Sequence, residues 1–192
     1  MAITANHISK SYEGRTVLRD VSVCLEDGGI YCLMGPSGIG KTTLLRILLG
    51  LEEPDGAWEA EGLPHGRVGV VFQENRLCEF AGARKNILLT AGRDGLLFPA
   101  EEILDGLLER EAWDRPVRSL SGGMQRRAAI ARALAARGSL LLMDEPFTGL
   151  DMDTKEHTIR KILDYRARRT LLVVTHQEED AEMLGAEVIR LM

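Results

Sequence analysis

The chain is 192 residues long, 45% of its residues are hydrophobic, and its formal net charge at pH 7 is −5. This length can bury one full core, so we expect one domain with at most a subdomain, and the acidic balance disfavours a protein that holds nucleic acid by charge. Three scattered cysteines without a C-x-x-C pair disfavour a disulfide framework and a thiolate zinc site, and favour reduced residues in a cytosolic protein.

The N-terminal residues show β-strand patterns and no signal peptide or membrane-spanning run. Residues 2–8 and 16–26 are rich in β-branched residues and are separated by a turn at 13–15, which predicts antiparallel strands. A second turn at 27–29 precedes residues 30–34, an apolar run that predicts a buried strand.

A phosphate-binding loop follows this strand. Residues 35–42 fit the pattern G-x-x-x-x-G-K-[ST], and residues 43–49 are apolar at helical spacing and end at Gly50, a C-cap position. Glycines let backbone N–H groups approach phosphates, and the helix presents its positive N-terminal end to the same anion. Lys41 can reach the β- and γ-phosphates, and Thr42 can bind Mg²⁺ through its hydroxyl.

Two further predicted strands end in single polar residues. Residues 68–72 form a compact apolar run followed by Gln73, and residues 171–174 form another that leads to His176. Side chains at the carboxyl ends of parallel strands line the ligand crevice of an open α/β sheet, so both residues are placed to reach a nucleotide. A lone glutamine is more often an ordinary loop residue, which leaves that alternative open. His7, His65 and His157 are expected to be surface residues.

Two adjacent carboxylates follow the continuous apolar run 140–143, which predicts a central parallel strand. Carboxylates at the end of a buried strand are unfavourable unless a cation or a proton-transfer role compensates them. We therefore expect Asp144 to hold Mg²⁺ through water and Glu145 to act as a general base on an attacking water.

The remaining segments are predominantly helical. Residues 74–118 contain apolar clusters at helical spacing, including 103–108, and no strand pattern, so we expect a small helical insertion. An alanine-rich helix is predicted up to residue 137, with Gly138 as its C-cap. Ser121, Gly122 and Gly123 then lie at its N-terminus, which is either a second anion site or a serine-capped end without a ligand.

Further helices are predicted over 152–165 and 178–184, and a short strand near 187–191 closes the chain. Arg166, Arg168 and Arg169 follow the first of these helices. We expect them to form a solvated cationic end that suits the helix dipole, and not a nucleic-acid patch.

In this order, the motifs resemble those of the ATP-binding subunit of ABC transporters over the full length of the chain. The signature segment, Leu120-Ser121-Gly122-Gly123-Met124-Gln125, is specific to that superfamily in this setting. The expected fold is α/β, with a P-loop NTPase core of mostly parallel sheet, N-terminal antiparallel β strands and a small helical subdomain. The resemblance implies one ABC ATPase domain over 1–192, with 1–73 and 119–192 as the RecA-like core and 74–118 as the helical insertion.

The resemblance also implies roles for single residues. Tyr12 is implied to stack on adenine, although its position alone indicates an ordinary half-buried aromatic residue. Ser121 and Gly123 are implied to contact the γ-phosphate held by the opposite subunit, and Asp151 to organise the dimer seam. Together with the motifs, it assigns catalysis to Glu145, His176 and Gln73 and metal binding to Thr42, Gln73 and Asp144. The residues assigned to the nucleotide are Tyr12, Gly35, Pro36, Ser37, Gly38, Ile39, Gly40, Lys41, Thr42, Thr43, Ser121, Gly122 and Gly123.

The implied cofactors are ATP and Mg²⁺, and the implied partners are a second copy of the chain, integral membrane permease subunits and an extracytoplasmic substrate-binding protein, without nucleic acid. The implied location is peripheral, at the cytoplasmic face of the membrane. Residues 72–77, 83–87 and 144–151 look like those of nitrate, sulfonate and taurine importers, although 78–82 replace the tryptophan-bearing stretch of that group. The alternatives are an ABC exporter ATPase, a soluble ABC ATPase acting on nucleic acid or ribosomes, and a small-molecule kinase.

Overall fold

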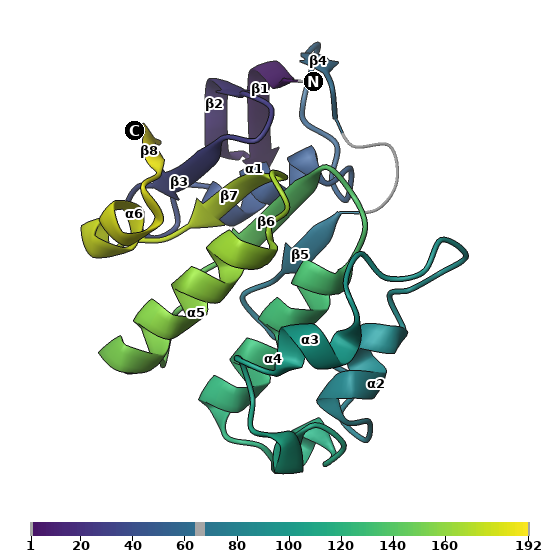
Figure 1. The fold of residues 1–192 in the computed structure, drawn as a ribbon. Helices are drawn as coiled ribbons and strands as arrows, with labels where there is room; N and C mark the ends of the chain where they lie inside the picture. Colours follow the sequence, from purple (N-terminus) through teal and green to yellow (C-terminus); the bar gives the residue numbers. More distant parts are fainter. Residues whose placement is uncertain (1, 64–67, 192) are drawn as a thin grey trace.

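The computed structural model describes residues 2–63 and 68–191 and has the predicted α/β architecture (Figure 1). His65 and part of segment 57–66, for which the sequence favours no single structure, lie outside the described residues. Five parallel strands form the central sheet, and an antiparallel sheet of order β2-β1-β4 stands beside it. The parallel sheet has, in spatial order, β5 (Gly69–Val71), β6 (Leu140–Asp144), β7 (Thr170–Val174), β3 (Ile30–Met34) and β8 (Glu187–Arg190).

The predicted N-terminal hairpin is present and is longer than its sequence pattern indicates. Strand β1 (Ile3–Tyr12) pairs with β2 (Arg15–Leu25), and both turn residues between them have positive φ, 49° at Glu13 and 80° at Gly14. Two such residues are typical of the type I′ turn, whose twist matches that of the paired strands. A short third strand, β4 (Glu59–Glu61), pairs with β1 within the segment that the sequence left unassigned.

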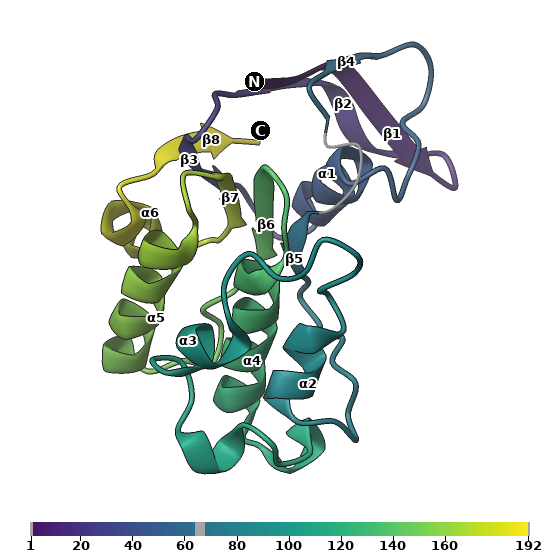
Figure 2. The same ribbon diagram turned by 45° about the vertical axis from the view of Figure 1, so that its right-hand side comes forward.

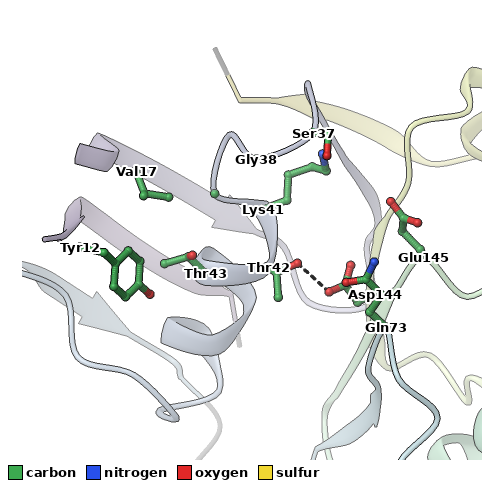
Figure 3. A pocket seen from close by; sticks show the side chains of 11 residues that line it. Tyr12, Val17, Ser37, Gly38, Lys41, Thr42, Thr43, Gln73, Asp144 and Glu145 are labelled. Atoms are coloured by element: carbon green, nitrogen blue, oxygen red, sulfur yellow. Dashed lines mark hydrogen bonds between the residues drawn. The ribbon is translucent and has the colours of Figure 1, made fainter. Parts of the chain in front are cut away.

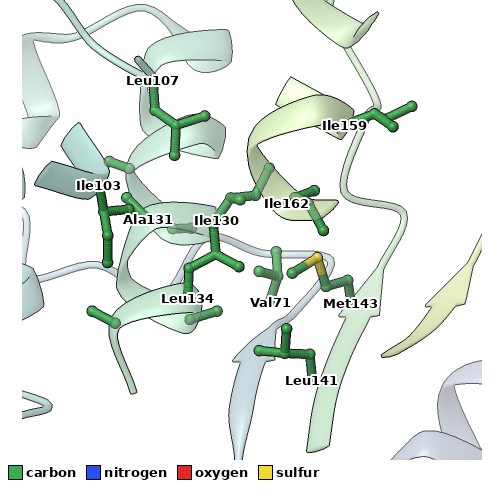
Figure 4. Close-up of a cluster of buried hydrophobic side chains, with 14 of the residues drawn as sticks. Val71, Ile103, Leu107, Ile130, Ala131, Leu134, Leu141, Met143, Ile159 and Ile162 are labelled. Carbon is green, nitrogen blue, oxygen red and sulfur yellow. The ribbon is translucent and has the colours of Figure 1, made fainter. Parts of the chain in front are cut away.

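Apolar side chains cover both faces of the parallel sheet. Leu140, Leu142 and Leu172 face one side, where they pack with helix α1 (Lys41–Leu48) and the inner face of the antiparallel sheet. Leu141 and Met143 face the other side, toward helices α4 (Gly122–Ala135) and α5 (Met152–Tyr165), as Figure 4 shows. Successive side chains of a strand point to opposite faces of the sheet, so one continuous apolar run contributes residues to the hydrophobic clusters on both faces.

Two short helices pack against α4 on the outer side of the second core (Figure 2). They are α2 (Ala83–Leu88) and α3 (Ala100–Leu104), both within segment 74–118. Of the apolar positions at helical spacing, Ile103 and Leu104 lie in α3, whereas Leu107 and Leu108 follow its end, with Gly106 at a φ of 157° between them. Leu107 and Leu108 are nevertheless buried, so their apolar pattern reports core packing.

The end of α4 differs from the prediction, and so does the environment of Arg169. The helix ends at Ala135, with Ala136 as its C-cap in an extended conformation, so Gly138 is not the cap. Arg169 is only 5% exposed, and its guanidinium donates to the carbonyls of Leu134 and Ala136 at 2.9 and 2.8 Å. Arg169 is therefore a buried cap of α4, and its burial lowers its pKa to about 10.

The C-terminal elements follow the predicted boundaries. Helix α5 spans the predicted residues, as does α6 (Glu178–Leu184), and β7 and β8 differ by one residue at one end. His7 and His157 are exposed as expected. Among the described residues, no helix is both long and apolar enough to cross a bilayer.

Candidate functional site

The phosphate loop connects β3 to α1 and takes a shape that only glycine permits at Gly40. This residue is the N-cap of α1 and has a φ of 109°. A Cβ atom there would lie 2.6 Å from Leu18 and 2.9 Å from Val17, both on β2. The antiparallel sheet therefore packs directly against the loop. Glycine is required at position 40 because of the positive φ and because no space is left for a Cβ atom.

The side chain of Lys41 lies along the inside of this loop. Its Nζ atom donates to the carbonyl oxygens of Gly35 and Pro36 at 2.7 and 3.0 Å, and the residue is 8% exposed. The loop carbonyls thus hold the ammonium group in place, where a phosphate oxygen can exchange for one of them.

Most of the predicted site residues line one cavity of about 280 Å³, shown in Figure 3. It lies between the phosphate loop on one side and the carboxyl ends of β5 and β6 on the other. Of the predicted residues, Gly35, Pro36 and Ile39 belong to the loop but are not among the described residues that line the cavity, and neither is His176. The described lining consists of Tyr12, Val17, Ser37, Gly38, Gly40, Lys41, Thr42, Thr43, Gln73, Asp144 and Glu145.

Thr42 and Asp144 meet in the middle of this cavity. The Thr42 hydroxyl donates to Asp144 Oδ2 at 2.9 Å, the dashed line in Figure 3. Asp144 is 4% exposed, and this burial raises the pKa of its carboxyl, against the lowering effects of the Thr42 hydrogen bond and the nearby Lys41 charge. A buried carboxylate beside a hydroxyl is an oxygen-donor pair that suits a hard divalent cation.

Glu145 extends from the next position into the cavity in a strained backbone conformation. Its φ is 47°, and its N–H donates to the carbonyl of Val174 on β7 at 2.9 Å. Its carboxylate accepts a 3.3 Å hydrogen bond from Thr148 and lies 3.5 Å from Nδ1 of His176. Two of the three predicted catalytic residues, Glu145 and His176, are thus adjacent, just beyond the ends of the neighbouring strands β6 and β7.

Gln73 lines the cavity at the end of β5 and is held by a residue that the sequence-based prediction missed. The guanidinium of Arg126, on α4, donates to the carbonyls of Phe72 and Gln73, both at 2.7 Å. Arg126 is 7% exposed, and burial lowers its pKa. It shares the buried face of α4 with Ile130 and Ala133, a helical spacing visible in the sequence.

Tyr12 lines one end of the cavity, and the residue is 42% exposed. Its hydroxyl donates to Glu52, and this hydrogen bond raises the pKa of the phenol. Glu52 in turn lies 3.3 Å from the guanidinium of Arg46 on α1. An aromatic face fixed at its hydroxyl end and open to the cavity is suited to stacking on a planar ring.

The signature segment does not reach this cavity within the described part of the chain. Ser121 is the N-cap of α4 and accepts a hydrogen bond from the N–H of Met124 at 3.2 Å. A Cβ at Gly123 would meet Leu150 at 3.2 Å, while a Cβ at Gly122 would have no described atom within 4 Å. The helix start is a capped terminus with a free surface at Gly122.

Asp151 caps the next helix in the same manner. Its carboxylate accepts hydrogen bonds from the N–H and the hydroxyl of Thr154 at 2.9 and 2.8 Å, which lower its pKa. The residue precedes α5 directly after Leu150, the neighbour of Gly123. The starts of α4 and α5 are therefore in contact.

Comparison with known sequences gives consistent results. A family model described as "ABC transporter" matches residues 18–148. The chain is 42% identical to an aliphatic sulfonates import ATP-binding protein, SsuB 2, of Burkholderia cenocepacia, over 95% of the chain and 70% of that protein. It is 40% identical to SsuB 1 of Nocardia farcinica and to SsuB 1 of Burkholderia lata, over 98% of the chain in both comparisons. The chain spans 77% and 60% of those two proteins, respectively.

Solved structures of ABC transporter cassettes share the fold of this chain. The dimeric structure of MJ0796, a bacterial ABC transporter cassette, has a TM-score of 0.85 at 29% identity and covers 98% of this chain and 94% of that one. A dimeric post-hydrolysis state of the same cassette, bound to ADP and Pi, has a TM-score of 0.84 at the same identity and coverage.

Proposed function

Because the chain belongs to the ATP-binding family of ABC transporters and is an ATPase of that family, we propose that it powers a membrane importer of aliphatic sulfonates or similar small anions. The proposal for the cargo rests on the 40–42% identity to the named sulfonate import proteins. The proposal for the chemistry rests on one observation, the cavity that gathers Lys41, Thr42, Asp144 and Glu145.

Nucleotide binding follows from the groups that line this cavity. Lys41 and the N–H groups at the start of α1 receive the β- and γ-phosphates, and Tyr12 stacks on adenine at the opposite end. Thr42 and Asp144 would hold Mg²⁺, because their oxygen atoms meet in the cavity, and Gln73 lines the same cavity with a side chain that carries an amide oxygen. When bound, Mg²⁺ would neutralise charge on the phosphates during phosphoryl transfer.

Hydrolysis is assigned to the residues at the ends of β6 and β7. Glu145 accepts the proton of the attacking water, and His176, 3.5 Å from it, holds the γ-phosphate. The water forms a bond to the γ-phosphorus while the bond to the leaving ADP oxygen breaks. Gln73, fixed by Arg126, orients the water.

The reaction site is completed by a second copy of the chain. Among the described residues, no atom lies within 4 Å of a Cβ built at Gly122, and Ser121 presents an exposed N-cap, so a nucleotide held by a partner can reach both. In a closed pair, each signature segment covers the nucleotide in the partner's phosphate loop. Asp151 lies beside this seam.

The membrane partners contact the helical segment. We place residues 1–73 and 119–192 in the ATP-hydrolysing core and 74–118 in an insertion that permease subunits dock on, at the cytoplasmic face of the membrane. Phe80, in this insertion, is 76% exposed, which is unusual for a large apolar residue and is consistent with a protein contact. A substrate-binding protein outside the cytoplasm delivers the anion.

Complementation between two inactive variants tests the shared site. Lys41→Ala disables the phosphate loop, and Ser121→Arg disables the signature segment, so each variant alone should be inactive. Random pairing of an equal mixture gives half mixed dimers with one intact site each, so we expect about one quarter of the wild-type ATPase rate. No recovery in the mixture, or full activity of a monomeric Ser121→Arg variant, contradicts the shared site.

The cargo is tested separately, in proteoliposomes that contain this chain and its permease. ATP hydrolysis should rise when a binding protein loaded with an alkanesulfonate is added outside, and should not rise with a loaded sugar-binding protein. Phosphate release without an added acceptor distinguishes the ATPase from a small-molecule kinase.

A further inference from the structure

A buried ion pair joins helix α5 to the segment that carries His176. Nζ of Lys155, on α5, lies 2.7 Å from Oδ1 of Asp180, in the first turn of α6. Their side chains are 8% and 3% exposed. Two charges removed from water are tolerated only when they are paired and hydrogen-bonded. The other hydrogen bonds of Lys155 and Asp180 therefore show which parts of the chain this pair holds in place.

Those contacts hold both chain neighbours of His176. Asp180 Oδ2 accepts a 2.5 Å hydrogen bond from the Thr175 hydroxyl, and Lys155 donates to the side-chain oxygen of Gln177 at 2.5 Å. The N–H of Gln177 also donates to the Thr175 hydroxyl at 3.2 Å, closing the bend around His176. The His176 side chain is itself 60% exposed and lies 3.5 Å from the Glu145 carboxylate, so these chain neighbours and Glu145, and not core packing, set its direction.

The other end of the pair leads to the proposed dimer seam. The N–H of Lys155 donates to the carbonyl of Asp151 at 2.8 Å, within the first turn of α5. The Asp151 carboxylate caps the same turn through Thr154. A helical turn that is closed by backbone and cap hydrogen bonds moves as a unit, so a shift of Asp151 shifts Lys155.

We propose that Lys155 and Asp180 are positioning residues that aim His176 at the γ-phosphate and transmit the position of the Asp151 loop to it. Like His176 itself, neither residue is among the described residues that line the nucleotide cavity, and both contact the chain neighbours of His176, so they act through it. The consequence for hydrolysis rests on the proposed function, whereas the positioning of His176 does not.

The first test measures ATP hydrolysis by the intact chain. The first variant is Lys155→Met, which leaves Asp180 buried without its partner and can destabilise the fold. The second variant, Lys155→Met/Asp180→Leu, replaces the buried pair by apolar side chains and avoids an unpaired buried charge. We expect kcat to fall roughly 10- to 100-fold in both, with KM for ATP within about twofold of wild type. The matched control is Arg160→Met, which removes an exposed charge from the same helix and leaves kcat unchanged.

A background variant separates positioning from stability. In His176→Ala, the further change Lys155→Met should lower kcat no more, because its target is already absent. A full additional loss, or wild-type kcat in the folded double variant, overturns the proposal.

A second readout does not depend on activity. In nucleotide-free protein, the His176 ring resonance, assigned with His176→Gln, should shift in Lys155→Met/Asp180→Leu and stay in place in Arg160→Met. An unchanged resonance overturns the positioning role, whether or not the chain hydrolyses ATP. If the wild-type chain hydrolyses no ATP, that result refutes the proposed function but not the positioning of His176.

Discussion

The phosphate loop and the signature segment both place glycines at the start of a helix, but their surroundings differ. At Gly40 the backbone has a φ of 109°, and Leu18 lies 2.6 Å from where a Cβ would be. Gly122 lies in the first turn of α4 with no described atom within 4 Å of such a Cβ. The chain itself therefore requires the first glycine and does not require the second. If Gly122 is necessary for activity, the reason lies in another molecule.

The largest effect we expect comes from trapping that second molecule. Glu145→Gln removes the proposed base and should lower ATP hydrolysis by about 10²- to 10⁴-fold while leaving nucleotide binding intact. With ATP and Mg²⁺, light scattering should then show a dimer that contains two nucleotides. The control is Glu145→Gln/Ser121→Arg, which should remain monomeric. A solitary Glu145→Gln chain with bound ATP would remove the distinction between the two glycine sites.

Alanine at each glycine gives opposite results if the comparison is correct. Gly40→Ala should destabilise the isolated chain by about 1–3 kcal/mol, because alanine is strained at positive φ and contacts Leu18. Gly122→Ala should leave the melting temperature unchanged or slightly raised, yet lower kcat by at least about tenfold, because the methyl group meets the partner's nucleotide. Melting curves and steady-state rates measure both. Normal activity of Gly122→Ala would show that no partner approaches this surface closely.

Much of this site could be predicted from the sequence because its residues follow strands or glycines. The ends of β5, β6 and β7 carry Gln73, Asp144 and His176, and the carboxyl ends of parallel strands meet at one edge of the sheet. The boundaries of α5 follow directly from its apolar spacing. These features are local, so a single sequence is sufficient to find them.

The contacts that the sequence did not reveal are made by long cationic side chains over large separations. Arg169 caps α4 from 33 residues away, and Arg126 reaches the Gln73 loop across 53 residues. A charged residue near a helix end is usually solvated, so its sequence position favoured the wrong environment for Arg169. Helix propensity alone also favours continuing the alanine-rich helix up to Gly138. Packing and the hydrogen bonds from Arg169 instead end α4 at Ala135.

Arg126 connects α4, the helix that begins at the signature segment, to the Gln73 loop beside the phosphate cavity, and a substitution can remove this connection. Arg126→Met removes both hydrogen bonds to the Gln73 loop, and we expect kcat to fall by roughly tenfold with little change in ATP affinity. Arg132→Met is the control, because Arg132 donates to Asn75 and Arg76, further along the same loop, and its loss should have a smaller effect. Equal losses in the two variants would indicate that α4 supports the loop as a whole.

A smaller effect is expected at the adenine end of the cavity. Tyr12→Ala should raise KM for ATP by about fivefold, since base–aromatic stacking contributes at least about 1 kcal/mol. Tyr12→Phe loses only the hydrogen bond to Glu52 and should stay within about twofold of wild type, because the ring remains. Equal binding by Tyr12→Ala and wild type would remove Tyr12 from the nucleotide site.

The smallest effect is a dependence of stability on pH, which the phosphate region should show and the signature residues Ser121, Gly122 and Gly123 should not. Burial raises the pKa of Asp144 in the folded chain, so the folded state binds this proton more tightly than the unfolded state does. In nucleotide-free protein, this group therefore lowers stability as pH rises from the ordinary carboxyl pKa through the raised one. Asp144→Asn removes the effect, and its melting temperature should exceed that of wild type at pH 7 by a few degrees, at about 2–4 °C per kcal/mol.

The matched variant for this last prediction is Ser121→Ala, at the other glycine site, where Ser121, Gly122 and Gly123 carry no titratable side chain. It should lose about 1 kcal/mol with its cap at every pH, so its difference from wild type is flat where that of Asp144→Asn rises. Adding Mg²⁺ and ATP should reverse the order of Asp144→Asn and wild type, because a bound cation favours the charged carboxylate. If the order does not reverse, the cation is held elsewhere, and the pairing of Thr42 with Asp144 serves only the fold.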